Sequence, residues 1–306
     1  MRVIDIDNIV GNMRDQNAFV FRCEEVFHDK ISSACATIVN SKKTTVLLSG
    51  PSGSGKTTTA NRIRSYLENL GIPVIMLSMD NFFLPLADRP PELDDWESPL
   101  CVNFEQLTNC LHSLKEGKLT DMPVYDFHNG TVGGYQKVQG DKDAYVVIEG
   151  IHALNPMMYD RVKDEAIGVY VTPRTRIVTR DDKIVTPERI RVARRMLRDL
   201  STRGHSLRDT VMRAESVDLG EVRYIKPFKT NAAIHIDTFH DYELCIISRY
   251  LKELPEFEQE LDQEFIDEYG LAELMKVVRE IPPLKTPFVP RDSLIREFIG
   301  NSIYYD

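Results

Sequence analysis

Residues 50–57 read GPSGSGKT, a complete G-x-x-x-x-G-K-[ST] phosphate-binding loop. The four residues TVLL at 45–48 are β-branched and aliphatic, as in a buried strand. Apolar or small residues follow at helical spacing from Thr58 to Leu70, and Gly71 predicts the end of that helix. Strand, glycine-rich loop and helix together predict a binding site for a nucleoside triphosphate.

Backbone amides and the positive end of the helix surround phosphate oxygens in such a loop. Lys56 is expected to reach the β- and γ-phosphates, and Thr57 is expected to hold Mg²⁺ through its hydroxyl. The loop therefore predicts a nucleoside triphosphate bound with Mg²⁺. The predicted nucleotide-binding residues of the loop are Gly50, Pro51, Ser52, Gly53, Ser54, Gly55, Lys56, Thr57 and Thr58.

The composition limits the classes of protein that remain. The 306 residues are 42% hydrophobic and 28% charged, as is ordinary for a globular protein. No apolar run approaches the roughly 20 residues that span a bilayer, and residues 1–16 lack the apolar core of a signal peptide. The net charge of −9 argues against a nucleic-acid partner. The 5 scattered cysteines indicate reduced thiols and a cytoplasmic location.

Alternating strands and helices predict an α/β fold with a parallel sheet. Further strands are expected at 74–78, 145–148, 167–171 and 234–236, and helices at 104–115 and 187–202. The first forty-odd residues look mostly helical, as does the chain after Asp241. Residues 84–103 hold four prolines and several acids, and predict a long functional loop.

Two acidic residues follow predicted strands, at the sheet edge where open α/β sheets bind ligands. Asp80 lies just past the second strand, where a carboxylate could accept a proton from an attacking hydroxyl or help hold Mg²⁺. Glu149 ends the strand VVIE and is expected as a second carboxylate on the magnesium side. The plainer alternatives are a capping aspartate and a strand-end glutamate.

A basic stripe lies on the helix expected at 187–202. Four arginines at spacings of three and four share one face of it: Arg191, Arg194, Arg195 and Arg198. Like charges so close repel unless an anion lies among them, and a triphosphate would supply that anion. Arg194 is therefore predicted to bind nucleotide, and Arg198 and Arg203 to form a lid over it. The alternative is a solvated face paired with Glu188 and Asp199.

These motifs together resemble the uridine kinase and phosphoribulokinase family, over roughly residues 20–250. The matching stretches are GPSGSGKT, LSMDNFF at 77–83, PVYDF at 123–127, VVIEGIHALNP at 146–156, RRMLRDLSTRGHS at 194–206 and SVDLGEVRYIKPF at 216–228. The bacterial uridine-kinase-like subgroup, with its ESP and G-x-H-A-L-N-P segments, is the most similar.

The resemblance implies a three-layer α/β/α P-loop fold and Mg·ATP-dependent phosphorylation of a small-molecule hydroxyl. The expected division is a helical N-terminal extension at 1–43, a kinase domain at 44–240 and a helical C-terminal extension at 241–306 that packs on it. Carried over by position, the expected catalytic residues are Asp80 as general base, Lys56, Glu149 and Arg198. The expected metal ligands are Thr57, Glu149 and Asp80, and Arg203 joins Arg198 in the lid.

The departures from the family pattern lie on the acceptor side. Leu100 stands where uridine-cytidine kinases carry an aspartate that grips the ribose, and Gly130 where they carry a base-reading histidine. Tyr125 and Phe127 are expected at the acceptor pocket, where rings can stack on a base. The remaining substrate candidates are Asp80, His128, and Glu97 with Asp94 and Asp95 from the long loop.

The most consistent function is therefore phosphorylation of uridine or cytidine to its 5′-monophosphate, a pyrimidine salvage reaction. One alternative is a kinase of another metabolite such as a sugar phosphate, for which Arg89 would be an anion ligand. Another is an ATP-binding regulatory or switch protein with little acceptor turnover. The resemblance also implies a possible homo-oligomer. The tail could pack on the sheet, close the acceptor site or form a subunit contact.

Overall fold

The computed structural model describes residues 2–90, 95, 97–254 and 257–304, without the side chains of residues 202, 203 and 258. Its centre is a five-stranded parallel sheet in the order β10-β7-β2-β6-β3. The strands are β2 (Thr45–Ser49), β3 (Val74–Ser78), β6 (Tyr145–Glu149), β7 (Ala166–Thr172) and β10 (Ile234–Asp237). Each strand predicted from the sequence is present within a residue or two.

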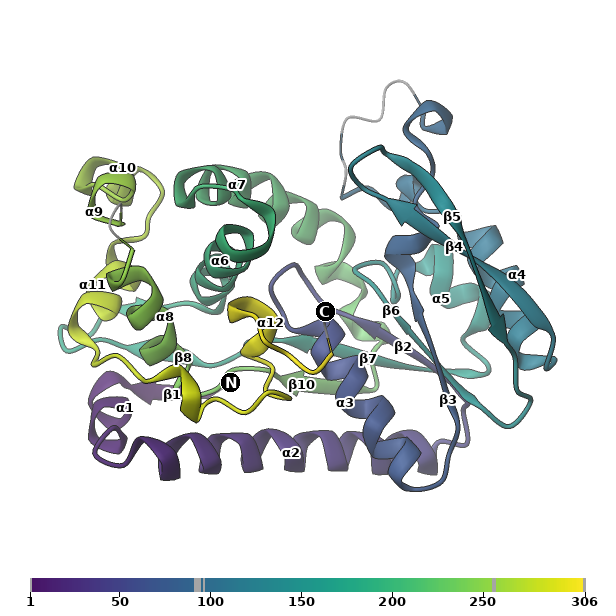
Figure 1. The fold of residues 1–306 in the computed structure, drawn as a ribbon, viewed down its shortest axis with the longest axis horizontal. Coiled ribbons are helices and arrows are strands. Elements are labelled where there is room, and N and C mark those ends of the chain that lie inside the picture. Colours follow the sequence, from purple (N-terminus) through teal and green to yellow (C-terminus); the bar gives the residue numbers. More distant parts are fainter. Residues whose placement is uncertain (1, 91–94, 96, 255–256, 305–306) are drawn as a thin grey trace.

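Alternate residues of the central strands are buried in two separate cores. Val46 and Leu48 of β2 belong to the core that includes α2 (Gln16–Asn40) and α3 (Lys56–Asn69). Leu47 belongs to the core under α4 (Phe104–Lys115) and α5 (Pro156–Val162). Helices therefore cover both faces of the sheet, and the predicted three-layer α/β/α P-loop fold is confirmed (Figure 1).

Two smaller sheets flank the central one. A long antiparallel hairpin joins β4 (Leu119–Asp126) and β5 (Thr131–Gln139). Near the N-terminus, β1 (Val3–Asp5) pairs in parallel with β8 (Arg176–Val178), and β8 pairs with β9 (Ile184–Val185). The expected helical N-terminal extension thus begins with a strand.

The remaining elements are helices and short helical turns outside the central sheet. The helices are α1 (Ile6–Asn12), α6 (Pro187–Arg198), α7 (Leu207–Tyr224), α8 (Glu243–Lys252), α9 (Phe257–Glu260), α10 (Gln263–Glu268), α11 (Ala272–Glu280) and α12 (Arg296–Ile299). Short turns of helix are η1 (Met79–Phe82), η2 (Leu86–Asp88), η3 (Pro99–Cys101), η4 (Asp199–Arg203), η5 (Lys226–Asn231) and η6 (Thr286–Phe288). Among the described helices, none is long and apolar enough to cross a membrane. The cysteine thiols are free.

The C-terminal residues complete the larger core. Apolar side chains of α8, α11 and α12 lie in the same buried cluster as those of α2, α3 and α6. The N-terminal strand is likewise paired with β8, within the segment expected as the kinase domain. The division at residues 43 and 240 stays a prediction, since a shared core runs across both positions.

Strand register brings the expected catalytic groups to one edge. Leu48 of β2, just before the phosphate loop, pairs with Glu149 of β6. Ser78 of β3, two residues before Asp80, pairs with the same Glu149. The loop and the two carboxylates therefore follow three adjacent strands at their carboxyl ends.

Candidate active site

The phosphate loop needs glycine at its two ends for different physical reasons. A Cβ on Gly50 would lie 2.1 Å from the carbonyl oxygen of Val171, so only glycine fits against β7. Gly55, immediately before α3, has a φ of 87°, in the left-handed region that favours glycine. The backbone thereby turns sharply from β2 into the helix, as a phosphate cradle requires.

Buried arginines of α6 hold the loop from its outer side. Nη1 of Arg194 donates to the carbonyl oxygens of Gly53 and Ser54, at 3.2 and 3.3 Å. Nη1 of Arg191 donates to the carbonyl oxygen of Ser52 at 3.3 Å. Thr238, after β10, donates its hydroxyl to the Ser54 carbonyl at 2.7 Å. The loop carbonyl oxygens are therefore hydrogen-bonded on the outer side of the loop. This orientation leaves loop amides on the inner, concave side, where a phosphate would bind.

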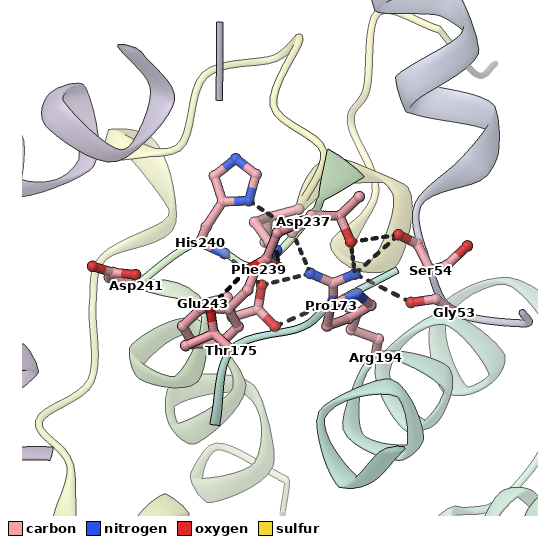
Figure 2. Close-up of polar contacts among 12 residues, drawn as sticks. Gly53, Ser54, Pro173, Thr175, Arg194, Asp237, Phe239, His240, Asp241 and Glu243 are labelled. Carbon is pink, nitrogen blue, oxygen red and sulfur yellow. Dashed lines mark hydrogen bonds and ion pairs between the residues drawn. The ribbon is translucent and has the colours of Figure 1, made fainter. Parts of the chain in front are cut away.

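Arg194 is the centre of this network, as Figure 2 shows. Its guanidinium bonds the Glu243 carboxylate through Nε at 3.2 Å and through Nη2 at 2.7 Å, and donates to the Thr238 carbonyl at 2.9 Å. Both members of the ion pair are 1% exposed. The sequence predicts Arg194 as a phosphate ligand, but here its guanidinium is engaged behind the loop. A direct bond to nucleotide stays a prediction.

Arg191, Arg194 and Arg195 of the basic stripe are buried, in contrast to the alternative of a solvated helix face, and Arg198 is half-buried. Arg191 forms an ion pair with Glu221 of α7, and both side chains are buried. Arg198 pairs with its neighbour Asp199 at 2.9 Å. α6 lies between the loop, α7 and α8, so its basic face meets protein groups instead of water. Arg203 lies in η4, where its side chain is outside the described part, and the lid stays a prediction.

Arg195 belongs to the basic stripe, but the sequence assigns it no individual role. Its side chain is buried, and none of its guanidinium nitrogens has a hydrogen-bond partner among the described residues. Burial lowers its pKa to about 10, although Asp218, 3.8 Å away, opposes that shift. Arg195 packs against Gly53, since a Cβ on that glycine would lie 3.3 Å from its Cγ. A buried cation without hydrogen bonds beside the loop suits an anionic ligand.

The two strand-end carboxylates lie together beside the loop lysine. Glu149 is buried, and its Oε1 accepts a hydrogen bond from the Ser78 hydroxyl at 2.7 Å. Burial raises the pKa of Glu149 to about 7, the charge of Asp80 adds to the shift, and Lys56 opposes it. Nζ of Lys56 donates to the carbonyl oxygen of Pro51 at 3.2 Å. Asp80 is exposed, and its charge acts on Glu149.

The donor set suits Mg²⁺ held jointly with phosphate oxygens and water. Thr57, Glu149 and Asp80 would supply one hydroxyl and two carboxylates, the hard oxygen ligands that Mg²⁺ prefers. Across the described residues no group of three or more His, Cys, Asp or Glu side chains forms a metal site by itself. Few protein ligands are expected, since Mg²⁺ in phosphoryl-transfer enzymes usually keeps waters and binds substrate phosphates.

The acceptor candidates fall into an aromatic group and a carboxylate. The rings of Tyr125 and Phe127 lie 4.9 Å apart, and both contact Phe83. Arg89 lies over the Phe83 ring and donates to the Tyr125 hydroxyl at 3.2 Å. Arg89 is thus already engaged with the aromatic group. His128 is exposed in the hairpin turn.

Glu97 of the long loop approaches the catalytic groups. Its Oε2 is buried and has no hydrogen-bond partner in the described part of the chain. Burial raises its pKa, and the charges of Lys56, Asp95, Arg195 and Asp80 all act on it. Glu97 therefore lies among the groups at the loop. Leu100, by contrast, is 51% exposed, and Asp94 lies outside the described residues.

The comparisons with known proteins agree with this geometry. A family model described as phosphoribulokinase / uridine kinase family matches residues 46–244. The uridine kinase of Borrelia turicatae is 30% identical over 213 residues, which are 68% of this chain and 93% of the relative. That of Saccharomyces cerevisiae is 32% identical over 203 residues, 63% of this chain and 36% of the relative.

A solved structure supports the same fold. A candidate fructose transport system kinase from Silicibacter sp. superimposes with a TM-score of 0.52 and 23% identity, over 67% of this chain and 98% of that chain. At that identity the likeness concerns the fold alone. The residues matched by the family model include the loop, both strand-end carboxylates and the basic helix. The chain therefore belongs to the phosphoribulokinase / uridine kinase family of P-loop kinases.

Proposed function

We propose that this kinase transfers the γ-phosphoryl group of ATP to the 5′-hydroxyl of uridine or cytidine. The observation that carries the proposal is the position of Glu149 and Asp80 at adjacent strand ends beside Lys56, close enough that their charges shift the Glu149 pKa. Relatives named uridine kinase, one of which is matched over 93% of its length, support the nucleoside acceptor. A place in pyrimidine salvage in the cytoplasm would follow.

The chemistry assigned to the protein groups is mainly positioning. Loop amides and Lys56 would hold the phosphates, and Asp80 would accept the hydroxyl proton as the new O–P bond forms and the bond to ADP breaks. Thr57, Glu149 and Asp80 would hold Mg²⁺, which supplies charge neutralisation on the phosphate oxygens when it is bound. The Asp80 carboxylate is exposed, as a group that meets a diffusing acceptor must be.

Glu97 is our candidate for the carboxylate that binds the ribose hydroxyls in place of Leu100. Its Oε2 is buried with no hydrogen-bond partner among the described residues. Its loop position lies between α7 and the catalytic groups, since a Cβ on Gly220 would lie 2.5 Å from the Glu97 Cβ. The rings of Tyr125 and Phe127 would stack on the base.

A sugar phosphate is the second candidate acceptor, and Arg195 favours it. Its buried guanidinium, which has no hydrogen-bond partner among the described residues, could bind the phosphate of the acceptor as readily as that of ATP. An ATP-binding regulatory protein is the candidate from another class. It predicts ATP binding without acceptor-stimulated ADP release.

The test is ADP release from Mg·ATP in the presence of uridine, cytidine, other nucleosides and ribulose 5-phosphate. We expect stimulation by a pyrimidine nucleoside, abolished by Lys56→Ala and lowered about 10²- to 10⁴-fold by Asp80→Asn. Asp88→Asn, at an exposed aspartate of η2, is the matched control and should leave the rate unchanged. Stimulation only by ribulose 5-phosphate, or by no acceptor, would rule out the nucleoside assignment.

A further inference from the structure

The C-terminal segment, residues 292–299, is seated on the phosphate loop. Figure 1 shows α12 beside α6 and the start of α3. Leu294 of this segment is fully buried, and its Cδ1 would lie 2.5 Å from a Cβ on Gly55. Ile295 and Phe298 are also buried. The loop therefore has a cover built from the end of the chain.

A carboxylate of this cover occupies the amino end of α3. Oε2 of Glu297 accepts hydrogen bonds from the backbone amide of Thr58 at 3.2 Å and from its hydroxyl at 2.8 Å. Thr58 is the third residue of α3, where helix amides have no acceptor within the helix. In a phosphate loop these amides bind phosphate oxygens, with which a carboxylate shares charge and hydrogen-bonding capacity. Glu297 thus makes the contact that a nucleotide phosphate needs.

The charge of Glu297 reaches the reacting groups as well. It acts on Glu149, where it adds to the rise in pKa. A triphosphate that entered the loop would bring further negative charge to the same place. Because like charges at short range repel strongly where water is excluded, the Glu297 carboxylate and a bound triphosphate disfavour each other.

The segment is anchored on both sides of this carboxylate. Asp292 forms an ion pair with Arg62 of α3, and Ser293 lies within hydrogen-bond distance of the Tyr242 hydroxyl, at 2.9 Å. The Phe298 ring lies 5.1 Å from the guanidinium carbon of Arg194. The same arginine holds the loop carbonyls, so the segment contacts the loop both directly and through its buried support.

We infer that the C-terminal segment is an autoinhibitory plug, in which Glu297 competes with a nucleoside triphosphate for the amide of Thr58. The inference rests on the proposed nucleotide binding at the loop, and is independent of which acceptor is phosphorylated. Nucleotide entry then requires the turn that carries Glu297 to leave the α3 terminus. The apparent affinity for ATP is reduced by the stability of that contact.

The first test is ATP affinity, measured by calorimetry on the full chain without any acceptor. Glu297→Gln removes the charge and keeps the shape, and we expect ATP to bind about tenfold more tightly. Glu268→Gln, at an exposed glutamate of α10, is the matched control and should bind as the wild type does. Equal or weaker ATP binding by Glu297→Gln would overturn the inference, because removal of a competing carboxylate must raise the affinity for ATP.

The second test uses the unaltered protein, so it does not depend on how a variant folds. Amide hydrogen exchange of residues 292–299 should become faster on addition of saturating Mg·ATP, because the displaced turn loses its contacts. Slower or unchanged exchange would overturn the inference and indicate a segment that clamps the bound nucleotide. Absence of ATP binding by both wild type and Glu297→Gln would refute the plug together with the nucleotide site. A failure of uridine to stimulate ADP release would concern the acceptor alone.

Discussion

Arg194 has two roles, an ion pair that affects the stability of the fold and hydrogen bonds that hold the phosphate loop. Comparison of Arg194→Met with Arg194→Met/Glu243→Gln is expected to separate these two roles. The single substitution leaves the Glu243 carboxylate, 1% exposed, without its partner, and should lower the free energy of unfolding by about 3–5 kcal/mol. In Arg194→Met/Glu243→Gln no buried charge is left unpaired. The new amide oxygen can still accept from the backbone amide of His240, 3.1 Å from the carboxylate. We expect this double variant to recover about 2 kcal/mol of the loss.

Nucleotide binding should not recover with stability. Both variants lack the Arg194 bonds to the carbonyl oxygens of Gly53 and Ser54, at 3.2 and 3.3 Å. Hydrogen bonds to a charged group contribute about 1.5–3 kcal/mol, so the dissociation constant of ATP should rise about 10- to 100-fold in each variant. Urea unfolding followed by circular dichroism gives the stability, and calorimetry gives the affinity.

The control is Arg249→Met, which removes the half-buried α8 partner of the exposed Glu253. Such surface pairs contribute about 0.5 kcal/mol or less, so both measurements should stay near those of the wild type. The reasoning would be refuted by a double variant as unstable as the single one. A double variant that binds ATP like the wild type would refute the role in holding the loop.

Four further predictions concern the carboxylates and the loop. The hydrogen bond from Ser78 lowers the pKa of Glu149, which burial raises to about 7, so Ser78→Ala should raise that pKa further. The increase of kcat/KM with pH, expected near pH 7 in the wild type, should therefore move to higher pH. Ionised Glu149 is also disfavoured by burial, so the free energy of unfolding should fall as pH rises from about 4.5 to 7, as pH-dependent urea unfolding can measure. Gly50→Ala should abolish ATP binding, because the new Cβ would lie 2.1 Å from a carbonyl oxygen of β7. The control is Gly11→Ala, which should bind ATP normally because a Cβ there would meet no described atom within 4 Å. Glu97→Gln should raise the KM for the acceptor at least tenfold while leaving that for ATP within about twofold.

For each of the three substitutions, one outcome would contradict the prediction. An unchanged pH profile in the Ser78 variant would mean that Glu149 does not control the acidic limb. Normal ATP binding by the Gly50 variant would mean that β2 and β7 can separate at the loop. Equal changes in both KM values for the Glu97 variant would indicate a general disturbance of the site.

The central sheet and the catalytic edge were predictable because their signals are local. A buried strand, a glycine-rich loop and a helix follow one another within residues 45–70, and Asp80 and Glu149 each end an apolar run. The pairing of β1 with β8 joins Val3 to Arg176, so no short window of sequence contains it. The β4–β5 hairpin carries Pro123 and many polar residues, which hide its strand period.

The basic stripe shows where sequence reasoning stops. Helical spacing places Arg191, Arg194 and Arg195 on one face of α6, and like charges there predict oxygen-rich partners. Spacing cannot say whether those partners are phosphates or the carbonyl oxygens and carboxylates of neighbouring elements. The difference depends on α7 and α8, whose Glu221 and Glu243 arrive from later in the chain. The same limit applies to the C-terminal tail. Its sequence predicts an apolar helical face, but not that this face packs on the phosphate loop.

The order of the central strands also bears on how the protein is made. Thr45 of β2 pairs with Val146 and Ala166, so both neighbours of the strand that leads into the loop are synthesised about a hundred residues later. At about 5–20 residues per second, the ribosome leaves this apolar strand unpaired for roughly 5–20 seconds. Non-local parallel pairing of this kind forms slowly and exposes aggregation-prone surface. Nascent chains in which β2 has left the ribosome before β6 and β7 are therefore the expected clients of a chaperone at the ribosomal exit.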